Sequence, residues 1–133
     1  MRTQARELAF KLIFERLFVK ENYSFDEEFF ASLKKEVNKE FSKQLVLSFE
    51  NHKEELSNLI SSHLVGYEID RVYKVDLAIL YIACTEISYF ETPFQIVINE
   101  AVELAKHYST IKSSRFVNGV LSSIVKDLNK NQG

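Results

Sequence analysis

Apolar positions along the chain recur at helical spacing. Most stretches place an apolar residue at every third or fourth position, which gathers the apolar side chains on one face of a helix. One stretch, 76–89, is apolar nearly all round, which is typical of a helix at the centre of a fold. The pattern predicts an all-α protein of about seven helices. The predicted helices span residues 3–20, 25–37, 41–49, 56–64, 76–89, 93–107 and 113–128.

Local sequence signals predict where several of these helices begin or end. Ser24 and Glu27 have the spacing of a capping box, which predicts a helix from about residue 25. Thr92 is predicted as the N-cap of a later helix, with Pro93 in its first position. Gly66 is the expected stop after the fourth helix. The short connection between 76–89 and 93–107 predicts antiparallel neighbours.

The composition agrees with one soluble helical domain. The chain has 133 residues, with only 3 glycines and 1 proline, so it is poor in the turn residues that all-β folds need. Cys84 is the sole cysteine, which excludes a disulfide within the chain and fits a reducing compartment. The longest apolar run, Leu77–Cys84, is far short of the ~20 residues of a membrane helix. We therefore expect a cytoplasmic protein that does not enter a membrane.

Catalytic and metal-binding motifs are missing from the sequence. His52, His63 and His107 lie in three different segments without ligand spacing. Glu103 and His107 are four residues apart, whereas diiron bundles use a Glu and a His three apart. Cys84 has no local signature of a nucleophile. We expect no enzyme activity, no metal and no cofactor.

Charge is distributed unevenly along the chain. The formal net charge is −2, yet residues 1–20 and 111–133 each carry +3, and the middle of the chain is acidic. If the two basic segments meet in the fold, they form one basic patch, which favours a polyanionic partner. In the first helix, Arg2, Arg6, Arg16 and Lys20 fall on one side, with Ala9 and Ile13 between them. This side is either a solvated polar face or part of that patch.

The segment "SSRFVNGVLSSI", residues 113–124, raises a separate question. Asn118 and Gly119 stand inside a predicted helix, where glycine costs about 1 kcal/mol relative to alanine. The structural explanation is that Gly119 lets the helix bearing "INEAVELAK" approach closely, with Asn118 hydrogen-bonded to Asn99 or Glu100. Nearby, Arg115, Phe116, Lys112 and Tyr108 combine cations with aromatic rings, which suits single-stranded RNA. Phe116 could instead simply cap the core.

Several of these segments together resemble one known family. "FQIVINEAVELAKHY" followed by "SSRFVNGVLSSI" is similar to the NusB family of bacterial transcription antitermination factors. "TQARELAFKLIF" resembles the family's opening helix and "VDLAILYIACTEI" its central helix. Residues 21–60 match only in helical character. The resemblance implies a single domain over 1–133, built of two small helical bundles packed across each other, roughly 1–66 and 67–130.

The resemblance also implies a function and its partners. These are binding to boxA RNA of ribosomal RNA leader transcripts and a heterodimer with the small-subunit ribosomal protein that acts as NusE. The pair joins an RNA polymerase antitermination complex, and a homodimer is compatible with the unpartnered state. Arg2 and Arg6 match family positions that contact RNA phosphates. The other positions matched to the RNA surface are Phe14, Tyr108, Lys112, Arg115 and Phe116.

The predicted partner surface is acidic. Asp76, and less closely Asp70, match acidic positions on the family's NusE-binding face. Leu77 and Tyr81 stand where the family has basic residues, which changes the ion pairing expected there. Lys112 stands near a position that is often acidic, and Thr3 and Gln4 interrupt the arginine-rich opening. Both changes alter the expected RNA contact.

Two other functions fit the sequence. The first is a helical protein-interaction module, without an RNA role, that uses the acidic middle of the chain to hold a basic protein. The second is an accessory RNA-binding domain without an antitermination role, since NusB-like domains also precede RNA methyltransferase domains. We expect the second less, because the sequence given ends at Gly133 in a polar tail without such a domain.

Overall fold

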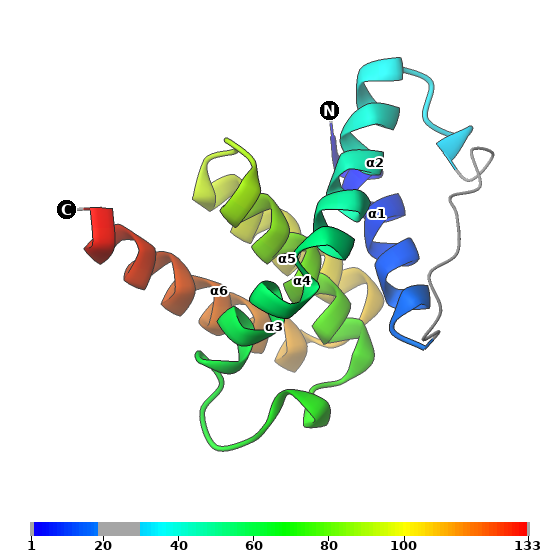
Figure 1. The fold of residues 1–133 in the computed structure, drawn as a ribbon. Helices are drawn as coiled ribbons and strands as arrows, with labels where there is room; N and C mark the ends of the chain where they lie inside the picture. The colour runs from blue at the N-terminus through cyan, green and yellow to red at the C-terminus, as the bar shows by residue number, and fades with distance from the viewer. Residues whose placement is uncertain (1, 19–29, 133) are drawn as a thin grey trace.

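The computed structural model describes residues 2–18 and 30–132 of the protein (Figure 1). Within these ranges the secondary structure is entirely helical, which confirms the predicted all-α class. The α-helices are α1 (Thr3–Arg16), α2 (Glu36–Asn51), α3 (Lys53–Ser61), α4 (Lys74–Tyr89), α5 (Phe94–Tyr108) and α6 (Ile111–Gln132). A short 3-10 helix, η2 (Ile69–Arg71), precedes α4. Among these described helices, none combines the length and the apolarity needed to cross a membrane.

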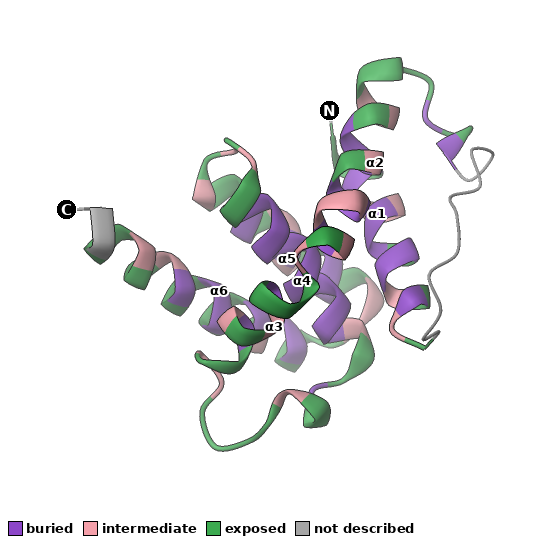
Figure 2. Ribbon diagram, viewed as in Figure 1, coloured by how far each residue is buried: buried purple, intermediate pink, exposed green. Residues whose placement is uncertain are grey.

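Helix α4 lies at the centre of the molecule. It packs against each of the other five α-helices, and every residue from Asp76 to Ile87 is buried (Figure 2). This confirms the central position predicted from its apolar composition. Burying an apolar residue on every side of a helix removes the most apolar surface from water, so α4 supplies the largest share of the core.

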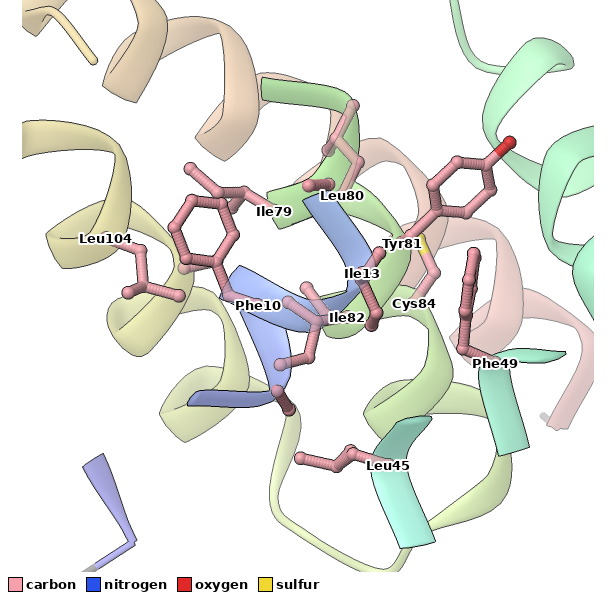
Figure 3. Close-up of a cluster of buried hydrophobic side chains, with 14 of the residues drawn as sticks. Phe10, Ile13, Leu45, Phe49, Ile79, Leu80, Tyr81, Ile82, Cys84 and Leu104 are labelled. Atoms are coloured by element: carbon pink, nitrogen blue, oxygen red, sulfur yellow. The ribbon is translucent and has the colours of Figure 1, made fainter. Parts of the chain in front are cut away.

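The core around α4 draws on both halves of the chain. Figure 3 shows Phe10 and Ile13 of α1 and Leu45 and Phe49 of α2 converging on α4 together with Leu104 of α5. All of them belong to one continuous cluster of buried apolar side chains. The division into bundles at about residue 66 stays a prediction, because the described core is shared across it.

The predicted helix 25–37 is not what the structure contains. Residues 30–35 form a turn and irregular chain, and α2 begins only at Glu36, so that prediction is wrong over 30–35. Residues 25–29, with the capping signal of Ser24 and Glu27, lie outside the described residues. Phe30 and Leu33 are 1% and 3% exposed, so a loop can bury apolar residues three positions apart without forming a helix. The predicted helix 41–49 lies inside α2.

Two predicted helix ends are displaced. α5 begins at Phe94, with Pro93 as an extended cap residue and no side-chain hydrogen bond at the cap, so Thr92 is not its N-cap. α3 already ends at Ser61, and Gly66 lies further along in a turn, with φ at 88°. Glycine suits this left-handed conformation because it has no Cβ. Gly66 therefore shapes the connection to η2 instead of stopping a helix.

Candidate nucleic-acid interface

Side chains of α1 and α5 meet at two places, and the order of these contacts shows that the two helices run in the same direction. At the start of α1, the Thr3 hydroxyl donates a hydrogen bond of 3.0 Å to Glu100, in the middle of α5. In the middle of α1, the ring of Phe10 lies 5.1 Å from that of Tyr108, the last residue of α5, between centroids. The surface along these two helices leads from the start of α1 to the turn between α5 and α6. Of the predicted RNA-binding residues, Arg2, Phe14 and Tyr108 belong to this surface, and Lys112, Arg115 and Phe116 follow on α6.

Arg6 is buried beneath this surface and does not lie on it. Its Nε and Nη2 donate hydrogen bonds of 2.8 and 2.7 Å to the two carboxylate oxygens of Glu86. Arg6 is 7% exposed and Glu86 is 1% exposed. Burial opposes the charge of Arg6, but hydrogen bonds to Glu86 and the charges of Glu86 and Glu100 outweigh it and raise the pKa of the guanidinium. The geometry commits Arg6 to joining α1 with α4, in place of the predicted phosphate contact.

The side of α1 that bears Arg6 and Arg16 faces the core. Ala9 and Ile13, which lie between them, are fully buried. Arg16 is 7% exposed and pairs with Glu50 of α2. The expectation of a solvated or RNA-binding face is therefore wrong for these two arginines. A glutamate from another helix balances each buried charge, as buried charges require.

Arg2 does lie at the surface. Its guanidinium carbon is 4.2 Å from the ring centroid of Phe41, and that of Arg6 is 5.3 Å from the same centroid. The aromatic face holds the Arg2 side chain by a cation–π contact. Arg2 also lines a groove of about 510 Å³ that Phe90, Pro93 and Ile96 border. A guanidinium held at the mouth of an open groove can pair with a phosphate from solution.

A row of aromatic rings follows the far half of α1. Phe14 lies between Phe10 and Phe18, with centroid distances of 6.4 and 5.1 Å. The Lys11 ammonium lies 5.7 Å from the ring centroid of Tyr108, and hydrogen bonding to Tyr108 is the main cause that raises the pKa of Lys11. Sequence reasoning counted Lys11 only as charge and did not single it out. Lys11 of α1 thus contacts the last residue of α5, which Ser109 and Thr110 separate from α6.

The first turns of α6 supply two further cations and a ring. Lys112 and Arg115 are exposed, and no ion pair is recorded for either in the described structure. Phe116 is half-buried against the core, and its ring lies 6.1 Å from that of Tyr67. Phe116 thus both covers the core and leaves part of its ring at the surface. The packing against the core agrees with the structural interpretation, and the RNA contact of Phe116 stays a prediction.

Asn118 and Gly119 lie on the outer side of α6. Both are exposed, and a Cβ built on Gly119 would meet no atom within 4 Å. The prediction that Gly119 permits close packing against α5 is therefore wrong. Asn99 hydrogen-bonds with Gln95, and Glu100 contacts Thr3 and Arg6, in place of Asn118. The helix buries Val117, Val120, Leu121 and Ile124 on the opposite side.

The two acidic residues of the predicted partner surface differ in exposure. Asp70 is exposed on η2. Asp76, in the first turn of α4, is 3% exposed and accepts a hydrogen bond of 2.8 Å from Ser113 through Oδ2. A pocket of about 300 Å³ opens beside Asp76, and we call it the Asp76 pocket. Its lining includes Tyr67, Arg71, Tyr73, Lys112, Ser113 and Phe116.

Sequence reasoning did not identify Tyr67, Arg71 or Tyr73 as lining residues of this pocket. The interleaving of aromatic and basic residues in "GYEIDRVYK" is the signal that could have indicated them. It is weak because the segment has no helical period. The loop residues reach the start of α6 only through the tertiary fold.

Tyr81, which with Asp70 and Asp76 makes up the residues predicted to bind the partner, lies in the core. It is 4% exposed, its hydroxyl lies 2.6 Å from that of Ser57, and its ring packs against Phe49 (Figure 3). Leu77 is likewise buried. Where the family has basic residues, this chain therefore places buried side chains that present no charge to a partner.

Other chemistry-bearing residues are structural. Cys84 is fully buried, and burial raises the pKa of its thiol to about 12. His63 Nε2 lies 2.6 Å from Asp127 Oδ2, which joins the end of α3 to α6. In the described part of the chain, no three His, Cys, Asp or Glu residues are grouped so that they could hold a metal ion.

Fold and surface together define a small helical protein with exposed cations beside aromatic rings on α1, at the end of α5 and at the start of α6. The NusB family model matches residues 3–126, and the chain belongs to the NusB family. It is 41% identical to the transcription antitermination protein NusB of Finegoldia magna, covering 94% of this chain and 93% of that protein. With NusB of Bacillus subtilis the identity is 38%, covering 96% of each chain.

Solved structures agree with the family assignment. The crystal structure of antitermination factors NusB and NusE in complex with dsRNA contains a chain that is 31% identical to this one, with a TM-score of 0.83. The match covers 95% of this chain and 96% of that one. NusB of T. maritima superposes with a TM-score of 0.82 at 28% identity, covering 95% of this chain and 91% of the other.

Proposed function

We propose that this protein is a transcription antitermination factor that binds boxA RNA of ribosomal RNA leader transcripts in the cytoplasm. It acts with the small-subunit ribosomal protein NusE as part of an RNA polymerase antitermination complex. Membership of the NusB family supports the antitermination role. The related NusB in the complex with NusE and dsRNA supports the two kinds of partner.

The observation that carries the RNA part is the line of exposed cations beside aromatic rings. It begins at Arg2 on Phe41, passes Lys11 and Tyr108, and reaches Lys112 and Arg115 at the start of α6. Phosphates pair with such cations, while unstacked bases stack on such rings. Phe14 and Phe116 supply further rings on the same route. Arg6 contributes indirectly, because it fixes α1 on α4.

The segment before α4, with its exposed Asp70, is the proposed contact for NusE. Asp70 is exposed there, and residues 59–110 carry a net charge of −4, which complements a basic ribosomal protein. Asp76 lies beneath this segment as a buried carboxylate. Tyr81 is left out of the proposed contact because it is buried.

The test is a titration of single-stranded boxA RNA at several salt concentrations, with and without purified NusE. We expect affinity to fall steeply with salt, because phosphate contacts release counterions. Arg2→Ala and Lys112→Ala should each weaken binding and lower the slope of log K against log salt by about 0.7, the value per phosphate on a single strand. Neither side chain is buried, so the helical circular dichroism should not change.

The matched control is Lys53→Ala. Lys53 is an exposed lysine on α3. This helix packs against α2, α4 and α6, away from the surface along α1 and α5. Its loss should leave RNA affinity unchanged. Equal binding by wild type, Arg2→Ala and Lys112→Ala would remove the proposed RNA surface. NusE binding without RNA retention at low salt would favour a protein-interaction module instead. Size-exclusion chromatography of the same samples distinguishes a homodimer from the heterodimer.

A further inference from the structure

The groove beside Arg2 lies between the start of α1 and the first half of α5, on the proposed RNA surface. We call it the Arg2 groove, and its volume is about 510 Å³. Residues of α1 line one part of it, with the exposed Arg2 among them. Phe90, Pro93 and Ile96 line another part with apolar surface. The groove therefore combines an exposed cation with an apolar wall.

The Arg2 guanidinium is held from one side. Its central carbon lies 4.2 Å from the ring centroid of Phe41, so the ring covers one face of the planar cation. Phe41 is itself fixed, because it is 6% exposed and its ring meets that of Phe90 edge-on, 5.6 Å away between centroids. Among the described residues, no ion pair includes Arg2. The other face and the N–H groups of Arg2 are therefore available to a ligand.

The rest of the groove suits an uncharged flat group. Ile96 is 47% exposed and leaves apolar surface that a bound group can cover. Glu100 also lines the groove, where it accepts the hydrogen bond of Thr3 and lies 3.9 Å from Arg6, and Glu91 adds an exposed carboxylate. These two carboxylates repel a phosphate or an acidic peptide inside the groove, but they do not repel a neutral nucleobase.

We propose that the Arg2 groove receives one unstacked base of the bound RNA, and that this base stacks on the open face of the Arg2 guanidinium. The stack then consists of Phe41, Arg2 and the base, and the apolar wall at Ile96 covers part of the base. A phosphate of the same strand pairs with the N–H groups of Arg2. Unstacked bases of single-stranded RNA stack on guanidinium planes in this way. The inference rests on the proposed RNA binding and deepens it, since it adds a base contact at Arg2 and makes Phe41 a positioning residue.

The stack requires a planar cation, which gives a way to separate it from the phosphate contact. A lysine ammonium has the same charge as a guanidinium but no flat face. Arg2→Lys therefore keeps the pairing with a phosphate and loses the stacking on a base. Arg2 is exposed and precedes the first residue of α1, so this substitution does not disturb the core.

The experiment titrates single-stranded boxA RNA, without NusE, and a set of RNAs in which one nucleotide at a time lacks its base. Length and charge stay constant across the set. We expect wild type to bind at least one abasic RNA roughly fivefold or more weakly, as the loss of a stacked base predicts. Arg2→Lys should bind the intact RNA more weakly by a similar factor, with an unchanged slope of log K against log salt. The groove position is the one at which Arg2→Lys no longer distinguishes the abasic RNA from the intact RNA.

Two further variants complete the design. Arg71→Lys is the matched control, because Arg71 is an exposed arginine on η2 that does not line the groove, so every abasic loss should remain. Phe41→Leu removes the ring beneath Arg2 and tests the positioning role. It should weaken RNA binding in the wild-type background and have no further effect in Arg2→Lys, whereas a purely structural role would weaken both equally. If circular dichroism shows that Phe41→Leu does not fold, Arg2→Lys alone decides the inference.

The outcomes separate this inference from the proposed function. Salt-dependent RNA binding in which Arg2→Lys has the affinity and the abasic losses of wild type would overturn the base stack and leave the proposed function standing. Absence of RNA binding by wild type, alone and with NusE, would overturn both. If Arg2→Lys weakens NusE binding while the abasic losses are unchanged, the groove holds a side chain of the partner, and the inference is wrong.

Discussion

At the scale of single residues, Arg6 shows how a surface-like residue becomes a structural one. Its sequence context, in a basic opening helix, favours an exposed cation, but two hydrogen bonds to Glu86 bury it. The sequence contains both residues, 80 positions apart, and no local pattern connects them. Only the packing of α1 on α4 brings them together. The same holds for Arg16 and Glu50.

Replacing Arg6 should destabilise the fold strongly. Arg6→Met leaves the Glu86 carboxylate buried without its partner, which costs roughly 3–5 kcal/mol for a broken buried ion pair. The measurement is urea unfolding followed by circular dichroism. Lys11→Met is the control, because the Lys11–Glu7 pair is exposed and is worth less than about 1 kcal/mol. Equal stability of Arg6→Met and wild type would show that the pair is not formed.

The single thiol should be inert in the native protein. Cys84 is fully buried and its pKa is raised to about 12, so at neutral pH it has neither exposure nor thiolate character. We expect a thiol reagent such as DTNB to label it only after unfolding in denaturant. Labelling within seconds under native conditions would contradict the burial of α4 on this side.

At the scale of elements, the amphipathic pattern predicted most helices, while side-chain burial decided the exceptions. The predicted helices 76–89, 93–107 and 113–128 correspond to α4, α5 and α6. Each of these segments has a strong apolar stripe or a continuous apolar run, so burying its apolar side chains strongly favours a helix. The segment before α2 was mistaken because Phe30 and Leu33 reach the core from a loop. When a segment has only a few apolar residues, a helix and a loop that buries its apolar side chains can give the same sequence pattern.

Gly119 should be replaceable with a gain in stability. A Cβ at this position meets nothing within 4 Å, and the residue lies inside α6. Gly119→Ala should therefore stabilise the protein by about 1 kcal/mol, the difference in helix propensity, and raise the melting temperature by a few degrees. Thermal unfolding followed by circular dichroism measures this. A lower melting temperature would mean that the site is more crowded than the structure shows.

At the scale of the whole molecule, the candidate interface depends on the parallel course of α1 and α5. The sequence indicated two basic segments that would form one basic patch if they met. It did not indicate where in the fold they would meet. In the structure Lys11 of the first segment contacts Tyr108, three residues before the second segment, while Arg2 lies at the start of α1. The glutamates of α2, α4 and α5 decide which arginines of α1 are buried in ion pairs and which cations stay exposed. The sequence therefore predicted that a basic surface would exist, but not which residues would form it.

The molecule should unfold as one cooperative unit. Because α4 packs against all five other α-helices within one core, neither half keeps its buried surface when the other unfolds. We expect the urea transitions seen by far-ultraviolet circular dichroism and by tyrosine fluorescence to coincide. Two separate transitions would instead support independent bundles divided near residue 66.

The burial of α4 has a further consequence for the chain before it folds. Leu77–Cys84 is an unbroken run of eight uncharged apolar residues without proline or glycine, rich in aliphatic side chains. Such a run forms intermolecular β-structure readily when it is exposed. Five helices shield it in the native state, but nothing in its own sequence does. Recovery of the protein from denaturant is therefore a competition between helix docking and aggregation, and the yield falls as the protein concentration rises.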